Sequence, residues 1–320
     1  MSLLSNPNMH GSRRFRELLS SSDMIQAPGA YDCLSARLIE AAGFPLVYMT
    51  GFGTSASYLG RPDVGLLGMS EMVDNARRIA DAVSVPVIAD ADTGYGNAIN
   101  VIRTVQAYER AGVAAIHIED QLAPKKCGHL EGKQVIPAAE MVQKICAAID
   151  ARNSSDFAII ARTDARAVEG LDRALERAHL YREAGADILF VEAPENEREI
   201  ETIARTLRGV PLLFNWAEGG KTPPVSLKHL HELGFRIVIF PISALLIATQ
   251  AINKALEVIK QQGTPVSVMA HMTPFREFVN SLGFAEIQEV ENRFGQSSQY
   301  RDAASDRCSS TVDRQKDSHT

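Results

Sequence analysis

Cysteine and tryptophan are scarce in this chain of 320 residues, which contains four cysteines and a single tryptophan. Cys33, Cys127, Cys146 and Cys308 show no C-x-x-C or other paired spacing, so the sequence gives no sign of a disulfide framework. We therefore expect a reducing, cytoplasmic location. Trp216 and the cysteines other than Cys127 are expected to be packing residues.

Long hydrophobic runs and basic clusters are also missing. No apolar run reaches the ~18 residues that a membrane span needs, and the polar start, residues 1–16, does not read as a signal sequence. The formal net charge is -6 and no basic block stands out, which argues against a nucleic-acid partner. The composition, 45% hydrophobic and 22% charged, is that of a globular chain with one large core.

A helix-like run that ends in glycine and leads into an apolar strand recurs four times. Gly43, Gly112, Gly185 and Gly234 are the natural left-handed ends of these helices. With one more strand-like run between successive glycines, the pattern predicts strands at about 24–28, 45–49, 85–90, 114–118, 157–162, 187–191, 211–215 and 236–240. It predicts helices at roughly 31–42, 69–82, 97–111, 137–151, 169–184, 196–207, 226–233 and 242–261.

The predicted strands are short, β-branched and apolar on both faces, as a buried parallel sheet requires. Eight strand–helix units indicate a (βα)8 TIM-type barrel. The alternative is an open doubly wound sheet, but no G-x-G-x-x-G opens a helix after a strand. We expect one domain over residues 1–295, including C-terminal helices at about 264–295, and a polar, disordered tail at 296–320.

Polar residues stand at the ends of five consecutive predicted strands. They are Asp90 with Asp92, Glu119 with Asp120, Arg162 with Asp164, Glu192, and Asn215 with Glu218. In a barrel the carboxyl ends of all strands meet on one face, where barrel enzymes carry their active sites. The sequence therefore predicts an active site there.

Three of these acids suggest a metal. Asp90 and Asp92, two apart in extended chain, would point the same way, and Glu119 on the next strand would crowd them. Carboxylate oxygens favour Mg²⁺ or Mn²⁺ over zinc. The alternative is that each acid caps a helix or pairs with Arg162. His117, inside an apolar strand, is expected to be a core residue and not a ligand.

A loop after the fourth strand reads Lys125-Lys126-Cys127-Gly128-His129. We expect the cationic neighbours to lower the pKa of the thiol, toward a range where it can give up a proton. The glycines of this segment suggest a mobile lid over the barrel mouth. The alternative is a solvated lysine pair beside an incidental cysteine.

Taken together, these motifs resemble a known family. D-A-D-T-G-Y-G at 90–96, I-E-D at 118–120, P-K-K-C-G-H at 124–129, A-R-T-D-A at 161–165 and V-E-A-P at 191–194 resemble the isocitrate lyase / phosphoenolpyruvate mutase superfamily. The similarity runs from about Gly29 to Glu257. Within the superfamily, E-G-G-K-T-P at 218–223 and the extended loop P-K-K-C-G-H-x-E-G-K are similar to the 2,3-dimethylmalate lyase group.

The resemblance implies roles for particular residues. Asp90 and Asp92 would approach Mg²⁺, or Mn²⁺, while Glu119 and Asp63 hold its waters. The implied substrate-binding residues are Thr50, Gly51, Gly128, Arg162, Glu192, Asn215 and Pro241. The implied catalytic residues are Cys127 as the acid, its loop neighbours Lys125 and His129, and Tyr48. Family members are usually homotetramers that exchange C-terminal helices, and their partners are small dicarboxylates.

The implied reaction is cleavage of the C2–C3 bond of a 2-hydroxy dicarboxylate such as 2,3-dimethylmalate, giving pyruvate and propionate. The group that removes the hydroxyl proton stays open, with Tyr48 acting through water as a candidate. Methylisocitrate lyases carry an arginine where this chain has Leu246, and oxaloacetate hydrolases a serine where it has Pro241, so both activities are secondary. Phosphonopyruvate-type enzymes usually lack the Cys-Gly-His loop. A non-catalytic binding barrel would have an eroded site.

Overall fold

The computed structural model describes residues 10–295 of the chain. These residues fall into two compact units, one running to Lys254 and the other starting at Ala255. The first unit contains all eight strands of the sheet.

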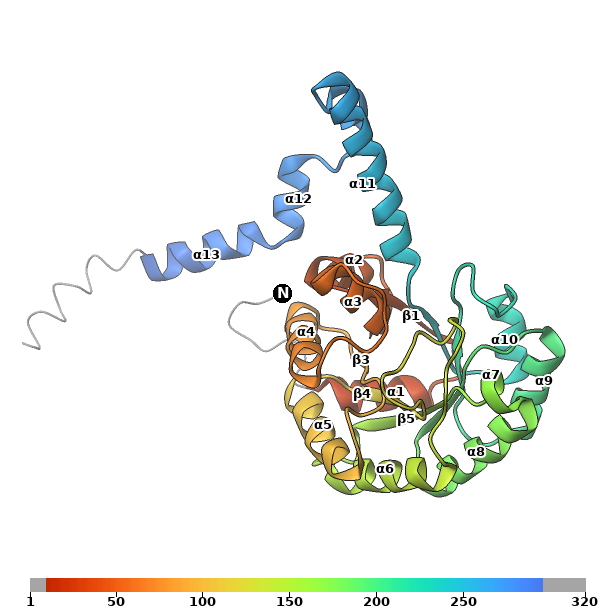
Figure 1. The fold of residues 1–320 in the computed structure, drawn as a ribbon. Helices are drawn as coiled ribbons and strands as arrows, with labels where there is room; N and C mark the ends of the chain where they lie inside the picture. Colours follow the sequence, from red (N-terminus) through yellow and green to blue (C-terminus); the bar gives the residue numbers. More distant parts are fainter. Residues whose placement is uncertain (1–9, 296–320) are drawn as a thin grey trace, which may run out of the picture. The chain divides into compact units, whose positions relative to one another are not determined.

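The first unit is a barrel of parallel strands surrounded by helices (Figure 1). The strands are β1 (Ile25–Ala30), β2 (Val47–Met49), β3 (Val87–Asp90), β4 (Ala115–Glu119), β5 (Ala158–Thr163), β6 (Ile188–Val191), β7 (Leu213–Asn215) and β8 (Ile237–Phe240). Their order is β6-β5-β4-β3-β2-β1-β8-β7, and a parallel bridge between Leu189 and Leu212 joins the two ends of this row. The predicted (βα)8 barrel is confirmed, and each strand lies within a few residues of its predicted range.

Helices follow the strands as the glycine pattern predicts. They are α2 (Cys33–Ala41), α4 (Met69–Ala82), α5 (Ala98–Arg110), α6 (Ala138–Ala151), α8 (Leu171–Glu183), α9 (Glu197–Thr206), α10 (Leu227–Leu233) and α11 (Ser243–Gln262). Gly43, Gly112, Gly185 and Gly234 all have a positive φ just after their helix, which an L side chain adopts only with strain.

Three α-helices of the first unit were not predicted as such. The amphipathic turn expected near Phe15 is a full helix, α1 (Gly11–Ser20), and Phe15 is buried with the side chains inside the barrel. The other two are α3 (Gly51–Leu59) and the short α7 (Arg166–Glu169). Two glycines give α3 a poor intrinsic helix propensity, but Thr50 caps it by accepting from Gly53 N.

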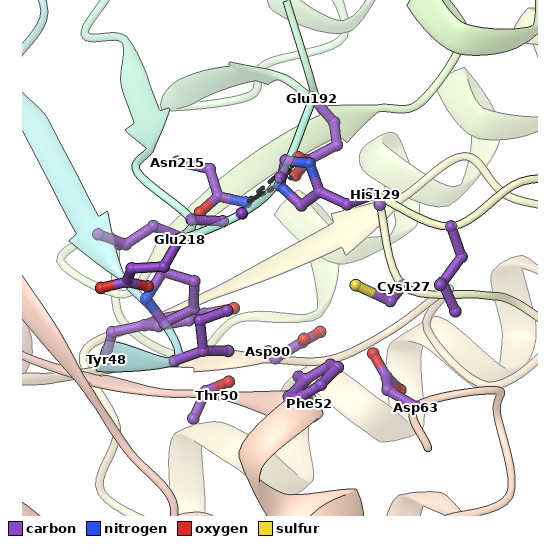
Figure 2. Close-up of a pocket in the computed structure, with 18 of the residues that line it drawn as sticks. Tyr48, Thr50, Phe52, Asp63, Asp90, Cys127, His129, Glu192, Asn215 and Glu218 are labelled. Carbon is purple, nitrogen blue, oxygen red and sulfur yellow. Dashed lines mark hydrogen bonds and ion pairs between the residues drawn. The ribbon is translucent and has the colours of Figure 1, made fainter. Parts of the chain in front are cut away.

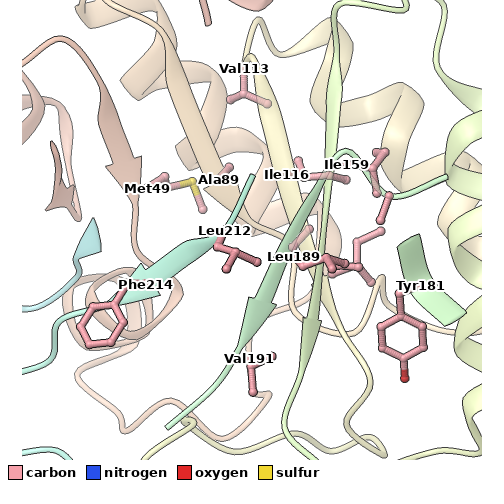
Figure 3. Close-up of a cluster of buried hydrophobic side chains, with 14 of the residues drawn as sticks. Met49, Ala89, Val113, Ile116, Ile159, Tyr181, Leu189, Val191, Leu212 and Phe214 are labelled. Carbon is pink, nitrogen blue, oxygen red and sulfur yellow. The ribbon is translucent and has the colours of Figure 1, made fainter. Parts of the chain in front are cut away.

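Apolar side chains of the strands pack in two clusters. The smaller lies inside the barrel and includes Phe15, Ile88, Ile160 and Ile237. The larger lies between the strands and the helices, and Figure 3 shows part of it. Because both faces of the strands are largely buried, charged strand residues gather at the strand ends, although β4 also buries His117 at its centre.

The second unit contains the end of α11, a 3₁₀ helix (Val266–His271), α12 (Phe275–Ser281) and α13 (Phe284–Gly295). The C-terminal helices predicted at about 264–295 are therefore present. No helix among residues 10–295 is both long enough and apolar enough to span a membrane. The predicted disordered tail, 296–320, lies outside the described residues.

Candidate active site

A cavity of about 170 Å³ opens at the carboxyl ends of the strands (Figure 2). Most of the predicted site residues line it: Tyr48, Thr50, Asp63, Asp90, Cys127, Gly128, His129, Arg162, Glu192, Asn215 and Pro241. Four lie beside it without lining it: Gly51, Asp92, Glu119 and Lys125. Cavities of ~150 Å³ hold a benzene-sized molecule, so this one suits a small metabolite.

Some lining residues were missed by sequence reasoning. Phe52, Leu130 and Ile242 supply apolar surface, and Glu218 was noted only as a polar residue after a strand. One carboxylate oxygen of Glu218 accepts from the Ser243 hydroxyl, and the other is buried with no hydrogen-bond partner among the described residues. Loop positions such as these carry no periodic signal, since their side chains are placed by the path of the loop.

The loop after β3 brings Asp90 and Asp92 together differently from the expected extended chain. Asp92 has a φ of 47°, and its backbone N–H donates to Asp90 Oδ1 at 2.9 Å. The two side chains are therefore related by a tight turn and not by strand alternation. The Gly51 backbone packs so closely on Asp90 that a Cβ there would collide with Asp90 Oδ2. This contact explains why a glycine stands at the start of α3.

Lys125 neutralises two of the acids. Its ammonium lies 2.6 Å from Asp92 Oδ1 and 2.7 Å from Asp63, and its side chain is buried. Burial raises the pKa of Asp92 to about 7, although Lys125 opposes the shift. A carboxyl group whose pKa is raised to near 7 by burial, beside a charged partner, is typical of a functional site.

Arg162, at the end of β5, is surrounded by carboxylates. Its Nε and Nη2 donate to Asp164 at 2.9 and 3.1 Å, Nη1 lies 3.2 Å from Glu119 Oε2, and Nε lies 3.5 Å from Glu192. Burial raises the pKa of Glu119 well above its usual value, against the lowering effect of Arg162. The guanidinium is thus fixed by Asp164 and Glu119, and it lines the cavity.

Cys127 lies in the wall of the cavity, on the opposite side from Glu218 (Figure 2). The expectation that cationic neighbours lower its pKa is wrong. Burial raises the pKa of the thiol to about 11, while Lys125 turns toward Asp63 and Lys126 donates to the Gly132 carbonyl. Cys127 is therefore a neutral thiol at physiological pH, a state that can donate a proton.

His129 and Asn215 form a polar corner with Glu192. His129 Nδ1 accepts from the Lys221 backbone N–H at 3.1 Å, so in the neutral ring Nε2 carries the proton. That N–H points to Glu192, 3.3 Å away, and Asn215 also donates to Glu192 at 3.2 Å. Glu192 is thereby held in place by two donors.

His117 is buried, as expected for a core residue, but it supports the site. Its Nε2 lies 2.8 Å from the Tyr48 hydroxyl and 3.4 Å from Asp90 Oδ1. Burial lowers the pKa of His117 to about 4 and raises that of Tyr48 well above its usual value. Both groups are therefore neutral at physiological pH, and His117 orients the Tyr48 hydroxyl that lines the cavity.

The acids around Lys125 and Arg162 can take a hydrated divalent cation. Among the described residues, Asp92 Oδ1 is paired with Lys125, Glu119 Oε2 is paired with Arg162, and Glu119 Oε1 is buried without a hydrogen-bond partner. Yet within residues 10–295 no three His, Cys, Asp or Glu side chains are close enough to hold a metal by themselves. Lys125 beside Asp92 and Arg162 beside Glu119 compensate part of the negative charge that these acids bring together. Mg²⁺ usually keeps several waters and takes one or two carboxylates, which these residues fit.

A parallel eight-stranded barrel with charged groups at its carboxyl ends defines the class: a (βα)8-barrel enzyme. The family model for phosphoenolpyruvate phosphomutase matches residues 15–260. The chain is 50% identical over 286 residues to 2,3-dimethylmalate lyase of Eubacterium barkeri, covering 89% of this chain and 99% of that protein. It is 45% identical over 274 residues to a 2-methylisocitrate lyase of Aeropyrum pernix, covering 86% and 88%.

Solved structures agree. A crystal structure of 2,3-dimethylmalate lyase matches with a TM-score of 0.85 and 41% identity, covering 92% of this chain and 97% of that one. Oxaloacetate acetylhydrolase with 3,3-difluorooxalacetate matches at 0.86 and 40%, covering 91% and 99%. Phosphonopyruvate hydrolase with oxalate and Mg²⁺ matches at 0.82 and 34%, covering 90% and 100%. The chain belongs to the isocitrate lyase / phosphoenolpyruvate mutase superfamily. Within it, the chain is a carbon–carbon lyase.

Proposed function

We propose that the chain cleaves the C2–C3 bond of a 2,3-dimethylmalate-like 2-hydroxy dicarboxylate, giving pyruvate and propionate, with Cys127 as the proton donor. The observation that carries this proposal is a neutral, half-buried thiol in the wall of a small cavity that Arg162 also lines. The 50% identity to 2,3-dimethylmalate lyase supports the substrate class.

Asp90 and Asp92 would hold Mg²⁺ or Mn²⁺, with Glu119 and Asp63 binding its waters. When bound, such a cation would polarise the 2-hydroxyl and an adjacent carboxylate, which makes that hydroxyl easier to ionise. The Mg²⁺ in the solved complex of phosphonopyruvate hydrolase supports this assignment.

The side chains of the chain supply the other steps. Arg162 is held by Asp164 and lines the cavity, where its guanidinium N–H donors would bind a substrate carboxylate, as guanidinium geometry allows. The Tyr48 hydroxyl lines the cavity and lies 2.8 Å from His117 Nε2, and it is our candidate to relay the substrate's hydroxyl proton: it would accept that proton through a water while passing its own proton to His117 Nε2. Bond cleavage leaves a carbanion, which receives its proton from Cys127 Sγ. Thr50, at the start of α3, and Gly51 would grip the other carboxylate.

Two sequence differences pointed to this substrate, Pro241 and Leu246, and the structure supports only the argument from Pro241. Pro241 lines the cavity, where it offers no hydroxyl to hold a hydrated ketone. Leu246 is 44% exposed and is not among the described lining residues, so the structure gives no support to the idea that it faces a third carboxylate. Discrimination against methylisocitrate therefore depends on the cavity itself, which is small and partly apolar. Because Pro241 lacks a hydroxyl, hydrolysis of oxaloacetate remains the less favoured of the proposed activities.

Replacing the proposed donor tests this function. Cys127→Ser keeps a similar shape but raises the pKa of the donor further, so kcat with 2,3-dimethylmalate should fall by roughly 10²–10⁴-fold, the usual contribution of a general acid. KM should change little. The matched control is Cys146→Ser, an exposed position outside the site, which should leave kcat unchanged. Near-normal turnover of Cys127→Ser would remove the assigned role.

We also propose a homotetramer that exchanges C-terminal helices, in the cytoplasm. The proposal is supported by large apolar side chains exposed in residues 255–295, namely Leu256, Ile259, Val266, Met269, Met272, Phe275, Phe278, Leu282, Phe284, Ile287 and Phe294. An exposed apolar surface of this extent is typical of an association surface. The free thiols of Cys33, Cys127 and Cys146 are compatible with a reducing compartment.

A further inference from the structure

We propose that Lys133 is a positioning residue. It fastens the loop that carries the proton donor Cys127 to the carboxylate clamp, which is the guanidinium of Arg162. Its ammonium bridges the Gly128 carbonyl, one residue after Cys127, and the Asp164 carboxylate, which holds Arg162. The inference rests on the proposed role of Cys127. It assigns to a lysine outside the cavity the task of keeping Cys127 and Arg162 in register.

The charged side chain of Lys133 is unusually deeply buried. Its side chain is 2% exposed, and that of Asp164 is fully buried. A buried ammonium is costly unless it is paired and hydrogen-bonded, and here Nζ lies 2.9 Å from Asp164 Oδ1 and also donates to the Gly128 carbonyl. Burial opposes ionisation of Asp164, but Arg162 and Lys133 outweigh it and hold the pKa of Asp164 well below its usual value. Asp164 is therefore a permanent anion between two cations.

The loop backbone packs directly on the clamp at Gly128. A Cβ on Gly128 would lie 2.6 Å from Arg162 Nη2 and 2.6 Å from Glu192 Cγ, so only a glycine allows this approach. The peptide that Lys133 holds is thus the one that covers the guanidinium. A shift of this peptide would move Cys127 and uncover Arg162 at the same time.

Besides His129, which contacts Lys221 and Glu192, the loop has anchors away from Asp164 and Arg162. The Cys127 N–H donates to the Asp63 carbonyl at 3.1 Å, which fixes the entry to the loop. Gln121 bonds both backbone groups of Lys126. The Lys126 ammonium reaches the Gly132 carbonyl but is exposed to solvent. Lys126 therefore offers a matched control: a lysine of the same loop that bonds a loop carbonyl without touching Asp164 or the clamp.

A purely structural lysine would only neutralise Asp164. Its loss would lower stability without selectively exposing Cys127. A positioning lysine predicts a local effect: the reactivity of Cys127 changes relative to that of Cys146, an exposed cysteine on α6. The direction of the change in the Cys127 alkylation rate is informative, because removing a cation disfavours the thiolate and by itself slows alkylation. Faster alkylation would therefore report a released loop.

The experiment compares Lys133→Met with Lys126→Met in the full chain. Native protein is treated with iodoacetamide, and peptide mass spectrometry gives the ratio of the Cys127 to the Cys146 alkylation rate. For Lys133→Met we expect this ratio to rise, and kcat for 2,3-dimethylmalate to fall, each by about tenfold or more, as for one lost charge-assisted hydrogen bond. KM should change less than kcat. Lys126→Met should match the wild type in both.

An unchanged ratio in folded Lys133→Met would overturn the proposal, whatever happens to kcat. If that variant does not fold, Lys133→Arg decides: it keeps the charge beside Asp164, but its broad guanidinium cannot occupy the ammonium site. The ratio should then rise as well, and a wild-type ratio with wild-type kcat would overturn the proposal. Because alkylation needs no substrate, it tests the fastening even if 2,3-dimethylmalate is not cleaved.

Discussion

At the scale of single residues, burial outweighs the sequence neighbours in setting the chemistry of Cys127. Two adjacent lysines suggested a lowered pKa, yet one turns to Asp63 and the other to a loop carbonyl. The thiol is left in a poorly solvated wall that favours its neutral form. Sequence spacing could identify the residue but not its protonation state, since that depends on which way the lysines turn.

The pH dependence of Cys127 alkylation checks this correction. With a pKa of about 11, the reactive thiolate is a minor form at neutral pH, and its fraction grows as pH rises. The rate at Cys127 should therefore increase about tenfold per pH unit between roughly pH 7 and 10. Peptide mapping after short iodoacetamide pulses measures it. A plateau below pH 9 would mean that the thiol is activated after all.

At the scale of elements, the strand ends were the best-predicted feature. Asp90, Glu119 and Arg162 all lie where the strand pattern places them, because charged groups are tolerated more readily at the end of a buried strand than inside it. The loops between were not predictable in the same way. The left-handed turn at Asp92 and the position of Lys125 depend on contacts between segments far apart in the chain.

Barrel helices hold the loop after β3 by its carbonyls. Tyr108 of α5 donates to the Asp90 carbonyl at 2.9 Å, and buried Lys144 of α6 donates to the Thr93 carbonyl at 3.2 Å. The loop is therefore fixed from behind, independently of the Asp92 carboxylate. Removing that carboxylate should leave the loop in place.

Metal removal and Asp92→Ala test the cation site in this loop. We expect exhaustive EDTA treatment to abolish turnover and Mg²⁺ or Mn²⁺ to restore it, because the acids around Lys125 are proposed to act through a cation. Asp92→Ala should lose turnover, with a melting temperature close to that of the wild type. The checks are steady-state kinetics and thermal unfolding. Full activity after EDTA would refute the metal assignment.

At the scale of the whole molecule, the barrel and the C-terminal helices differ in how much of their structure the sequence predicts. Eight repeats of one pattern made the barrel predictable, and the two helices past residue 262 were also found from periodicity. A partner surface for the exposed apolar side chains of these helices is not encoded in any local pattern of the sequence. The tetramer was accordingly suggested by family resemblance and not by the residues.

Sedimentation equilibrium of the full chain tests the assembly. We expect a particle with the mass of four chains, because the exposed apolar side chains of residues 255–295 need a partner surface. Phe275→Asp, at a side chain that is 84% exposed, should weaken the assembly by placing a charge in the proposed interface. A monomer in the wild type at micromolar concentration would contradict the proposed tetramer.

The most direct test of the proposed reaction is a comparison of kcat/KM for 2,3-dimethylmalate, methylisocitrate and oxaloacetate with Mg²⁺, with products identified by NMR. We predict pyruvate and propionate from 2,3-dimethylmalate, at a kcat/KM at least about tenfold above the other two, a difference that cavity size and one missing hydroxyl can produce. A clear preference for methylisocitrate, or rapid release of oxalate from oxaloacetate, would contradict it.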